Sequence, residues 1–287
     1  MRYFILLFLW ILSVALMGCY QNQSLKVTSL ETADSIIGGS IATPSEFPFL
    51  VNIWLNTPKD NYVAHHCGGS LIHKKWVLTA AHCVLQDASD RSEGLIKSKD
   101  LQLYLGSIQV SGEGGRLLKV KSIQIHPQFS WPHYDVALIE LLNEIQDVPV
   151  LSLNTVPIQD FKLPMNAIVM GWGLTDKEGR VDAEIVNKVS VPVTSSKICT
   201  QDEFVRKKGW KISEDILCVE TNLNTRSSCP GDSGGPLITS KNGQYVQIGI
   251  VSWGSACRWP FDKIQSNIEG YANVAYVYGW IQQVINK

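Results

Sequence analysis

The chain has 287 residues, and 45% of them are hydrophobic, which is enough for a full core in one large domain or two modest ones. Its 25 Lys and Arg nearly balance its 26 Asp and Glu, so the net charge is −1. This balance excludes binding to nucleic acid or to an anionic membrane through bulk charge.

The first residues differ in composition from the rest. Arg2 precedes a run at residues 4–17 that is apolar except for Ser13, and Gly18-Cys19 follows. A short apolar run behind a basic residue predicts a signal peptide, residues 1–18, and therefore export. The alternative is a membrane-spanning helix, but that requires about 20 apolar residues.

The end of this signal, Leu16-Met17-Gly18-Cys19, resembles the lipobox of bacterial lipoproteins, in which the Cys is acylated and becomes the N-terminus. The alternative is an ordinary signal peptide that is cleaved nearby, with Cys19 removed or left as a free thiol. Residues 19–35 are mostly polar and are predicted to be a leader or propeptide tether to a folded domain at residues 36–287.

Six further cysteines follow Cys19. An even number in an exported chain predicts disulfide bonds, but six cysteines allow about 15 pairings and spacing does not choose among them. They are Cys67, Cys83, Cys199, Cys218, Cys229 and Cys257.

Short runs with strand character are separated by turn residues along most of the domain. Examples are residues 101–105, 120–125 and 246–251. Many short strands with Gly and Pro turns favour a barrel or a sandwich. Residues 59–61 and 86–100 are predicted to be solvated loops.

Two helices are expected. One follows Ser195-Ser196 and ends before Gly209. The other closes the chain, because apolar residues recur there at three- and four-residue intervals, at Val274, Val277, Ile281, Val284 and Ile285.

Three motifs carry the chemistry expected of an amide hydrolase. Ser233 lies in Gly231-Asp232-Ser233-Gly234-Gly235-Pro236, a turn that can expose a hydroxyl and direct N–H groups at one point. Without other matching motifs, an ordinary turn with an idle Ser would be the favoured interpretation of that run. His82 in Thr79-Ala80-Ala81-His82-Cys83 supplies a base, and Asp135 heads an apolar strand, where its carboxylate needs donors such as an imidazole N–H.

A zinc site is the competing interpretation of this histidine-rich region. Its ligands would come from His65, His66, Cys67, His82 and Cys83. Such a site would consume the proposed base, so we expect neither a metal nor another cofactor.

With these motifs the sequence resembles the chymotrypsin/trypsin family of serine peptidases from Ile36 to the C-terminus. Further anchors of the resemblance are Ile36-Ile37-Gly38-Gly39, Cys67-Gly68-Gly69-Ser70-Leu71-Ile72, Gly171-Trp172-Gly173 and Ser252-Trp253-Gly254. The implied fold is all-β, with two six-stranded antiparallel β-barrels of the chymotrypsin type and a C-terminal helix.

The resemblance also implies residue roles. His82 is the general base and acid, Asp135 orients it, and Ser233 is the nucleophile, with the N–H groups of Gly231 and Ser233 binding the oxyanion. Ser252, Trp253 and Gly254 would pair with the substrate and line its pocket. The implied disulfide bonds are Cys67–Cys83, Cys199–Cys218 and Cys229–Cys257.

In the family that the sequence resembles, specificity for the residue before the scissile bond is set by the residue six before the nucleophile, which here is Ser227. Trypsin-like members have Asp there, so a neutral floor with Gly254 open favours a large apolar side chain. Lys and Arg rank second because Glu269 aligns on or near the far wall. The alternative, slightly favoured, makes Glu269 a surface residue and puts Gly270 at the wall. Pro230 removes a backbone donor beside the oxyanion loop.

The family is activated when a new α-amino group pairs with the Asp beside the nucleophile, here Ile36 and Asp232. The bond to be cut follows Ala33-Asp34-Ser35, with no basic residue, so we expect a separate activating protease. The cut separates Cys19 from Ile36. We therefore expect a membrane-tethered zymogen that becomes a soluble periplasmic or extracellular monomer acting on proteins or peptides.

The main rival function is a non-catalytic binding lipoprotein on the same fold, and a structural or adhesive lipoprotein is another. Neither explains why His82, Asp135 and Ser233 all lie in matching motifs.

Overall fold

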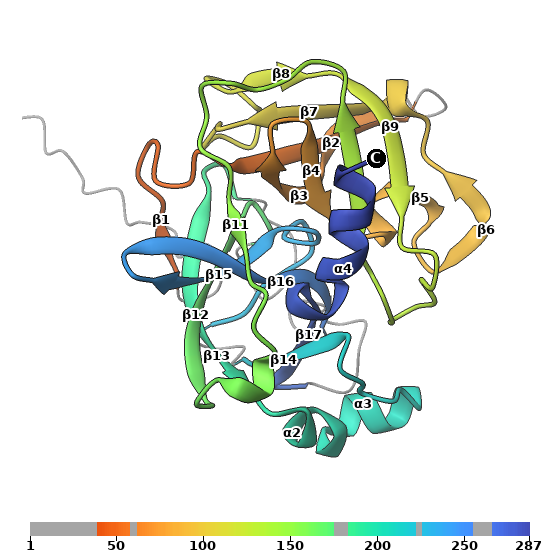
Figure 1. The fold of residues 1–287 in the computed structure, drawn as a ribbon, viewed down its shortest axis with the longest axis vertical. Coiled ribbons are helices and arrows are strands. Elements are labelled where there is room, and N and C mark those ends of the chain that lie inside the picture. Colours follow the sequence, from red (N-terminus) through yellow and green to blue (C-terminus); the bar gives the residue numbers. More distant parts are fainter. Residues whose placement is uncertain (1–38, 58–61, 175–182, 222–225, 255–265) are drawn as a thin grey trace, which may run out of the picture. The chain divides into compact units, whose positions relative to one another are not determined.

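Two large β-sheets form the body of the described chain (Figure 1). The computed structural model describes residues 39–57, 62–174, 183–221, 226–254 and 266–287. The predicted signal and leader, with Cys19 and Ile36, lie outside this part of the chain, as do the predicted loop at residues 59–61 and Cys257.

The first sheet is a curled half-barrel in the order β8-β7-β2-β3-β4-β10-β9, with every pair antiparallel. Burial alternates along β7, whereas β10 is buried at every position except Glu140. The strands are β2 (Leu50–Thr57), β3 (Tyr62–His73), β4 (Trp76–Thr79), β7 (Leu101–Leu105), β8 (Arg116–Leu118), β9 (Val120–Ile125) and β10 (Ala137–Leu141).

The second sheet closes into a six-stranded barrel, β13-β12-β15-β16-β17-β14, because β13 also pairs with β14. Two short strands lie outside it: β1 pairs with β13, and β11 runs parallel to β16. The strands are β1 (Ser40–Ile41), β11 (Ser152–Leu153), β12 (Met165–Gly171), β13 (Asn187–Thr194), β14 (Ile216–Glu220), β15 (Pro236–Lys241), β16 (Gln244–Gly254) and β17 (Ile268–Asn273).

The predicted all-β fold of the chymotrypsin type is therefore confirmed, together with its C-terminal helix. One detail differs. Strand pairing among the described residues closes the second barrel, and the first remains a curled sheet.

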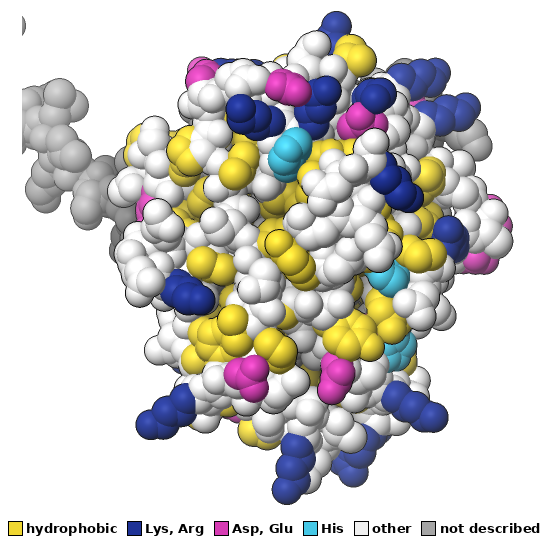
Figure 2. Space-filling model, in the orientation of Figure 1, with side chains coloured by type: hydrophobic (Ala, Val, Ile, Leu, Met, Phe, Trp, Pro, Cys, Tyr) yellow, Lys and Arg dark blue, Asp and Glu magenta, His cyan; other side chains and the backbone are white. Residues whose placement is uncertain are grey.

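The region after Ser195 contains two short helices instead of the single predicted one. They are α2 (Ser196–Gln201) and α3 (Glu203–Lys208). Asp202 divides them because its carboxylate accepts hydrogen bonds from Phe204 N and Val205 N and so caps a new helix. Gly209 ends α3 in the left-handed conformation, with φ of 69°. Basic side chains gather over α2 and α3 (Figure 2), three of them in the last turn of α3.

The C-terminal helix, α4 (Val274–Ile285), forms as its apolar periodicity predicts, with Val274, Val277, Ile281 and Val284 buried. Three single turns of 3-10 helix complete the list: η1 (His82–Val84), η2 (Ser98–Asp100) and η3 (Ile158–Asp160). Among the described residues, no helix is both long and apolar enough to cross a membrane.

Most of residues 86–100 are exposed, as predicted, but Ile96 is buried in the core and the segment is not irregular. It includes most of a small antiparallel sheet formed by β5 (Leu85–Asp87) and β6 (Asp90–Leu95). Burial along β6 shows no period-two alternation, which explains why the sequence did not indicate a strand.

One apolar cluster joins the two sheets and α4. It contains Leu138 of the first sheet, Met170 and Ile250 of the second, and Val277 of the helix. The sheets therefore share a core, and the loops that they present to each other are held at a common boundary.

We expect Leu138→Ala to lower the free energy of unfolding by about 2 to 5 kcal/mol, because Leu138 is fully buried and the change leaves a cavity. Denaturant unfolding measures the change. Leu117→Ala is the matched control, since that side chain is 55% exposed and should change stability by less than about 0.5 kcal/mol. Equal losses in both variants would contradict the shared core.

Candidate active site

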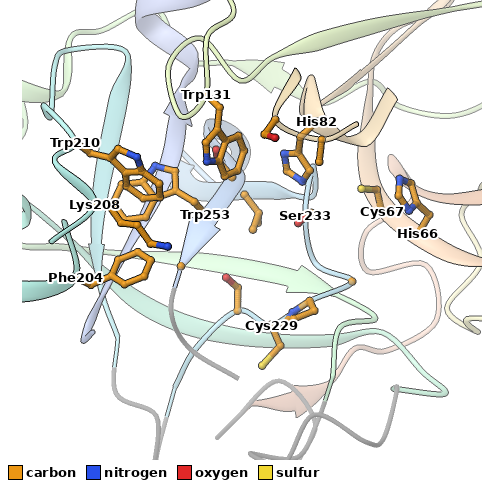
Figure 3. Close-up of a pocket in the computed structure, with 18 residues that line it drawn as sticks. His66, Cys67, His82, Trp131, Phe204, Lys208, Trp210, Cys229, Ser233 and Trp253 are labelled. Atoms are coloured by element: carbon orange, nitrogen blue, oxygen red, sulfur yellow. The ribbon is translucent and has the colours of Figure 1, made fainter. Parts of the chain in front are cut away.

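Residues from both sheets line a cavity of about 440 Å³. In Figure 3, His82 and Ser233 lie on one side of it, and Phe204, Lys208 and Trp210 lie on the opposite side, with Trp131 and Trp253 between. Predicted site residues that are 151 positions apart, from His82 to Ser233, therefore meet at one cavity.

His82 begins η1, three residues after β4 ends. The Cys67–Cys83 disulfide bond ties this turn to β3. The His82 side chain is 11% exposed, and its Nδ1 lies 2.7 Å from Asp135 Oδ2. The His82 backbone N–H donates to the other oxygen, Oδ1, at 2.9 Å. Asp135 therefore contacts both the ring and the backbone of the predicted base.

Asp135 lies just before β10 and is 1% exposed. Burial raises the pKa of its carboxyl. Two neighbours lower that pKa by more than burial raises it. His82 does so through its charge and its hydrogen bonds, and Ser252 does so through its hydroxyl, which donates to Oδ2 at 2.6 Å. Asp135 is thus kept ionised inside the protein. Ser252 belongs to β16, so the second sheet supplies one donor and the first sheet supplies the others.

The loop that carries Ser233 is tied to both sheets. Gly68 N donates to Ser233 O at 2.7 Å, and Gly234 N donates to Val251 O at 2.8 Å. Gly231 has φ of 101°, a conformation that side-chain-bearing residues rarely adopt. Among the described residues, the N–H groups of Gly231 and Ser233 have no hydrogen-bond acceptor, so both are free to bind an anion.

His65 is a residue near the site that sequence reasoning treated only as a candidate metal ligand. Its Nε2 lies 2.8 Å from Gly231 O, and its Nδ1 lies 2.7 Å from Asn52 Oδ1. Burial lowers its pKa to about 4, against the opposing effect of the Gly231 bond. His65, which is half-buried, thus anchors the loop that carries Gly231 to the first sheet. The separation of 166 residues left no local pattern that would reveal this contact.

Glu269 is fully buried against Ser227, the predicted pocket floor, and neither residue lines the cavity, although their neighbour Ser228 does. Glu269 Oε1 accepts from Ser227 Oγ at 2.5 Å and from Ser228 N at 3.1 Å, while Oε2 accepts from Ser228 Oγ at 2.6 Å and Tyr271 OH at 3.0 Å. Burial raises the pKa of this carboxyl, and these hydrogen bonds oppose the rise.

The favoured expectation that Glu269 is a surface residue was therefore wrong, since its exposure is 1%. The cause is Gly254, where a Cβ would lie 2.9 Å from Glu269 Cγ. Because Gly254 has no side chain, the aliphatic part of the Glu269 side chain packs against the backbone of β16, and its carboxylate lies inside the protein. Gly270 packs instead against the ring of Trp253.

Asp232 is a second buried carboxyl, next to Ser233. Its Oδ1 accepts from Gly173 N and its Oδ2 from Cys229 N, both at 2.8 Å. Burial raises its pKa to about 7, against these two hydrogen bonds, and the negative charge of Glu269 adds to the rise. Its predicted partner, Ile36, is outside the described ranges.

An aromatic wall completes the cavity. Trp131 lies edge-on to His82, with ring centroids 5.5 Å apart, and Trp210 lies edge-on to Trp253 at 4.9 Å. Phe204 and Lys208 of α3 extend this wall. Sequence reasoning missed this wall apart from Trp253, because Trp131, Phe204, Trp210 and Trp253 come from four separate segments of the chain and share no motif.

Two of the expected disulfide bonds are present, Cys67–Cys83 and Cys199–Cys218. Cys229 is also disulfide-bonded, and its expected partner Cys257 is not among the described residues. His82 and the sulfurs of Cys67 and Cys83 lie within 4.8 Å of one another. Those sulfurs are bonded to each other, so they offer zinc no thiolate ligand.

Comparisons with known proteins agree with this architecture. A family model described as Trypsin matches residues 36–281. Mouse tryptase is 31% identical over 267 residues, which cover 89% of this chain and 90% of the tryptase. These matches and the fold define a serine endopeptidase, a class of hydrolase with protein substrates. The chain belongs to the trypsin family of chymotrypsin-type serine peptidases, whose members are generally secreted or extracellular.

Proposed function

We propose that this endopeptidase cleaves peptide bonds through Ser233, His82 and Asp135. The observation that carries the proposal is the chain of contacts to the buried Asp135, 2.7 Å from the ring nitrogen of His82 at the cavity that Ser233 also lines. His82 takes the Ser233 proton as the hydroxyl attacks the carbonyl, and then gives it to the leaving amine. Asp135 stabilises the imidazolium that forms between these steps.

The N–H groups of Gly231 and Ser233 bind the oxyanion of the tetrahedral intermediate. Their freedom from other acceptors within the described chain supports this role. His65 holds Gly231 through its carbonyl, which fixes the direction of this loop. Water hydrolyses the acyl-enzyme by the same proton transfers in reverse order.

Ser233→Ala should lower kcat by a factor on the order of 10⁴ to 10⁶, because the nucleophile is lost. It should also abolish covalent labelling by an organofluorophosphate. Ser240→Ala, at an exposed position of β15, is the control and should label like the wild type. Labelling that persists in Ser233→Ala would refute the assignment.

We propose that the pocket accepts Lys and Arg before the scissile bond as well as large apolar side chains. The neutral Ser227 floor and the open Gly254 suit Phe, Tyr or Leu. Glu269, hydrogen-bonded to Ser227 at 2.5 Å, supplies a buried carboxylate that a basic side chain can neutralise. Because Glu269 is buried, we rank Lys and Arg higher than the second place that they took in the sequence analysis.

Glu269→Gln should lower kcat/KM for Lys and Arg peptides about 10- to 100-fold, the loss expected for a charged hydrogen bond, and leave Phe and Leu peptides within about threefold. Peptide libraries measure both ratios. Glu203→Gln, an exposed change on α3, serves as the control. An unchanged ratio of basic to apolar cleavage would mean that Glu269 does not contact this residue of the substrate.

We also propose that the uncut chain is a zymogen and that cleavage after Ser35 frees the Ile36 ammonium to pair with Asp232. The support is a buried Asp232 carboxyl whose described donors, Gly173 N and Cys229 N, leave its pKa near 7. Because the bond follows Ala33-Asp34-Ser35, another protease makes the cut. If Cys19 is acylated, the same cut releases the enzyme from its membrane.

In the uncut chain, folding favours protonated Asp232, so the free energy of unfolding should fall as pH rises from about 4 to about 7. After cleavage the Ile36 ammonium favours ionised Asp232, so the free energy of unfolding should no longer fall over this pH range. Denaturant unfolding of Ser233→Ala protein, cut and uncut, with and without Asp232→Asn, isolates the contribution. N-terminal sequencing should find Ile36 in the active soluble enzyme. Full activity with residues 35–36 still joined would contradict the proposal.

A further inference from the structure

The residue before Asp135 has an unusual backbone conformation. Tyr134 has φ of 51°, in the left-handed region that a bulky side chain rarely occupies. Its carbonyl accepts from Val136 N at 2.7 Å, so a tight turn surrounds Asp135. Such a conformation costs about 1 to 3 kcal/mol and persists only when neighbouring groups hold it.

A carboxylate from the second half of the protein supplies one of those groups. Asp215 Oδ2 accepts from Tyr134 N at 2.9 Å, and both Asp215 oxygens lie within 3.2 Å of His133 Nδ1. The Tyr134 ring also stacks on His126, with centroids 4.7 Å apart and an angle of 11°. Two consecutive residues before Asp135 are thus bound to one carboxylate.

Asp215 is itself firmly placed. It lies directly before β14, is 2% exposed, and its carbonyl accepts from Asn273 N at the start of α4. Asn273 Nδ2 binds Glu214 O, and Ser213 Oγ donates to Asp215 Oδ1 at 2.5 Å. The anchor therefore belongs to the second barrel, while the loop that it holds belongs to the first sheet.

We propose that Asp215 is a positioning residue for the catalytic machinery, fixing the left-handed turn at Tyr134 so that the Asp135 carboxylate faces His82. The proposal rests on the proposed role of Asp135. Asp215 does not line the cavity and touches no reacting atom. Asp215 acts through the backbone N–H of Tyr134, which is the residue directly before Asp135.

Asp215→Ala should lower kcat roughly 10- to 100-fold with KM for a short peptide nearly unchanged, the size expected when a catalytic group is misplaced by about 1 Å. The acid limb of the kcat/KM profile should move to lower pH, because a carboxylate held less closely stabilises the imidazolium less. Asp215→Asn keeps an acceptor for Tyr134 N and should recover most of kcat.

Ser70→Ala is the matched control. Ser70 Oγ donates to Gln247 Oε1 at 2.7 Å, a fully buried hydrogen bond that also joins the two sheets but does not reach the Asp135 loop. It should lower the free energy of unfolding and leave kcat and the pH profile unchanged. If Asp215→Ala shows only that behaviour, Asp215 is merely structural and the proposal is wrong.

Two further variants keep the test decisive. If Asp215→Ala does not fold, His133→Ala should still lower kcat severalfold at constant KM, and wild-type kcat with a wild-type pH profile would overturn the proposal. Ser233→Ala is measured in the same series. Unchanged Asp215 variants beside an inactive Ser233→Ala would reject the positioning role and leave the triad standing, whereas an active Ser233→Ala would reject both.

Discussion

The site depends on one buried charge that neither sheet satisfies alone. Asp135 accepts from His82 N and is paired with His82 Nδ1 on the first sheet, and it accepts from Ser252 Oγ on the second. A buried carboxylate without such donors would strongly destabilise the folded state. Folding is therefore favoured only when the two sheets are aligned so that both supply donors to Asp135. The chemistry therefore depends on the same contact as the assembly of the fold.

The site holds two more buried carboxyls, Asp232 beside Ser233 in the chain and Glu269 in β17, and the charge of Glu269 raises the pKa of Asp232. This effect couples the pocket floor to the group that we assign to activation. A basic side chain that neutralises Glu269 also makes ionisation of Asp232 easier. The roles that we propose for Glu269 in substrate choice and for Asp232 in activation therefore share one electrostatic environment, although Glu269 lies in β17 and Asp232 in the loop before β15.

The sequence predicted the fold class and the cysteine pairings that are present, because each rests on a contiguous motif or on family resemblance. The same motifs pointed to His82 and Ser233, which meet at one cavity, and to Asp135, which contacts His82. It did not predict the contacts of His65 or Asp215, whose partners are 166 and 81 or 82 residues away. It also misplaced Glu269, since the burial of that side chain depends on the space left by Gly254 on a neighbouring strand. The break between α2 and α3 could have been predicted, because Asp is a typical N-cap residue and Asp202 caps α3.

The hydrogen bond from Gly68 N to Ser233 O has a consequence for how access to the enzyme can be controlled. It joins a strand of the first sheet to the residue proposed as nucleophile, so the two halves cannot swing apart about a hinge without moving that residue. Gating by domain closure would therefore disturb the residue on which the proposed chemistry depends.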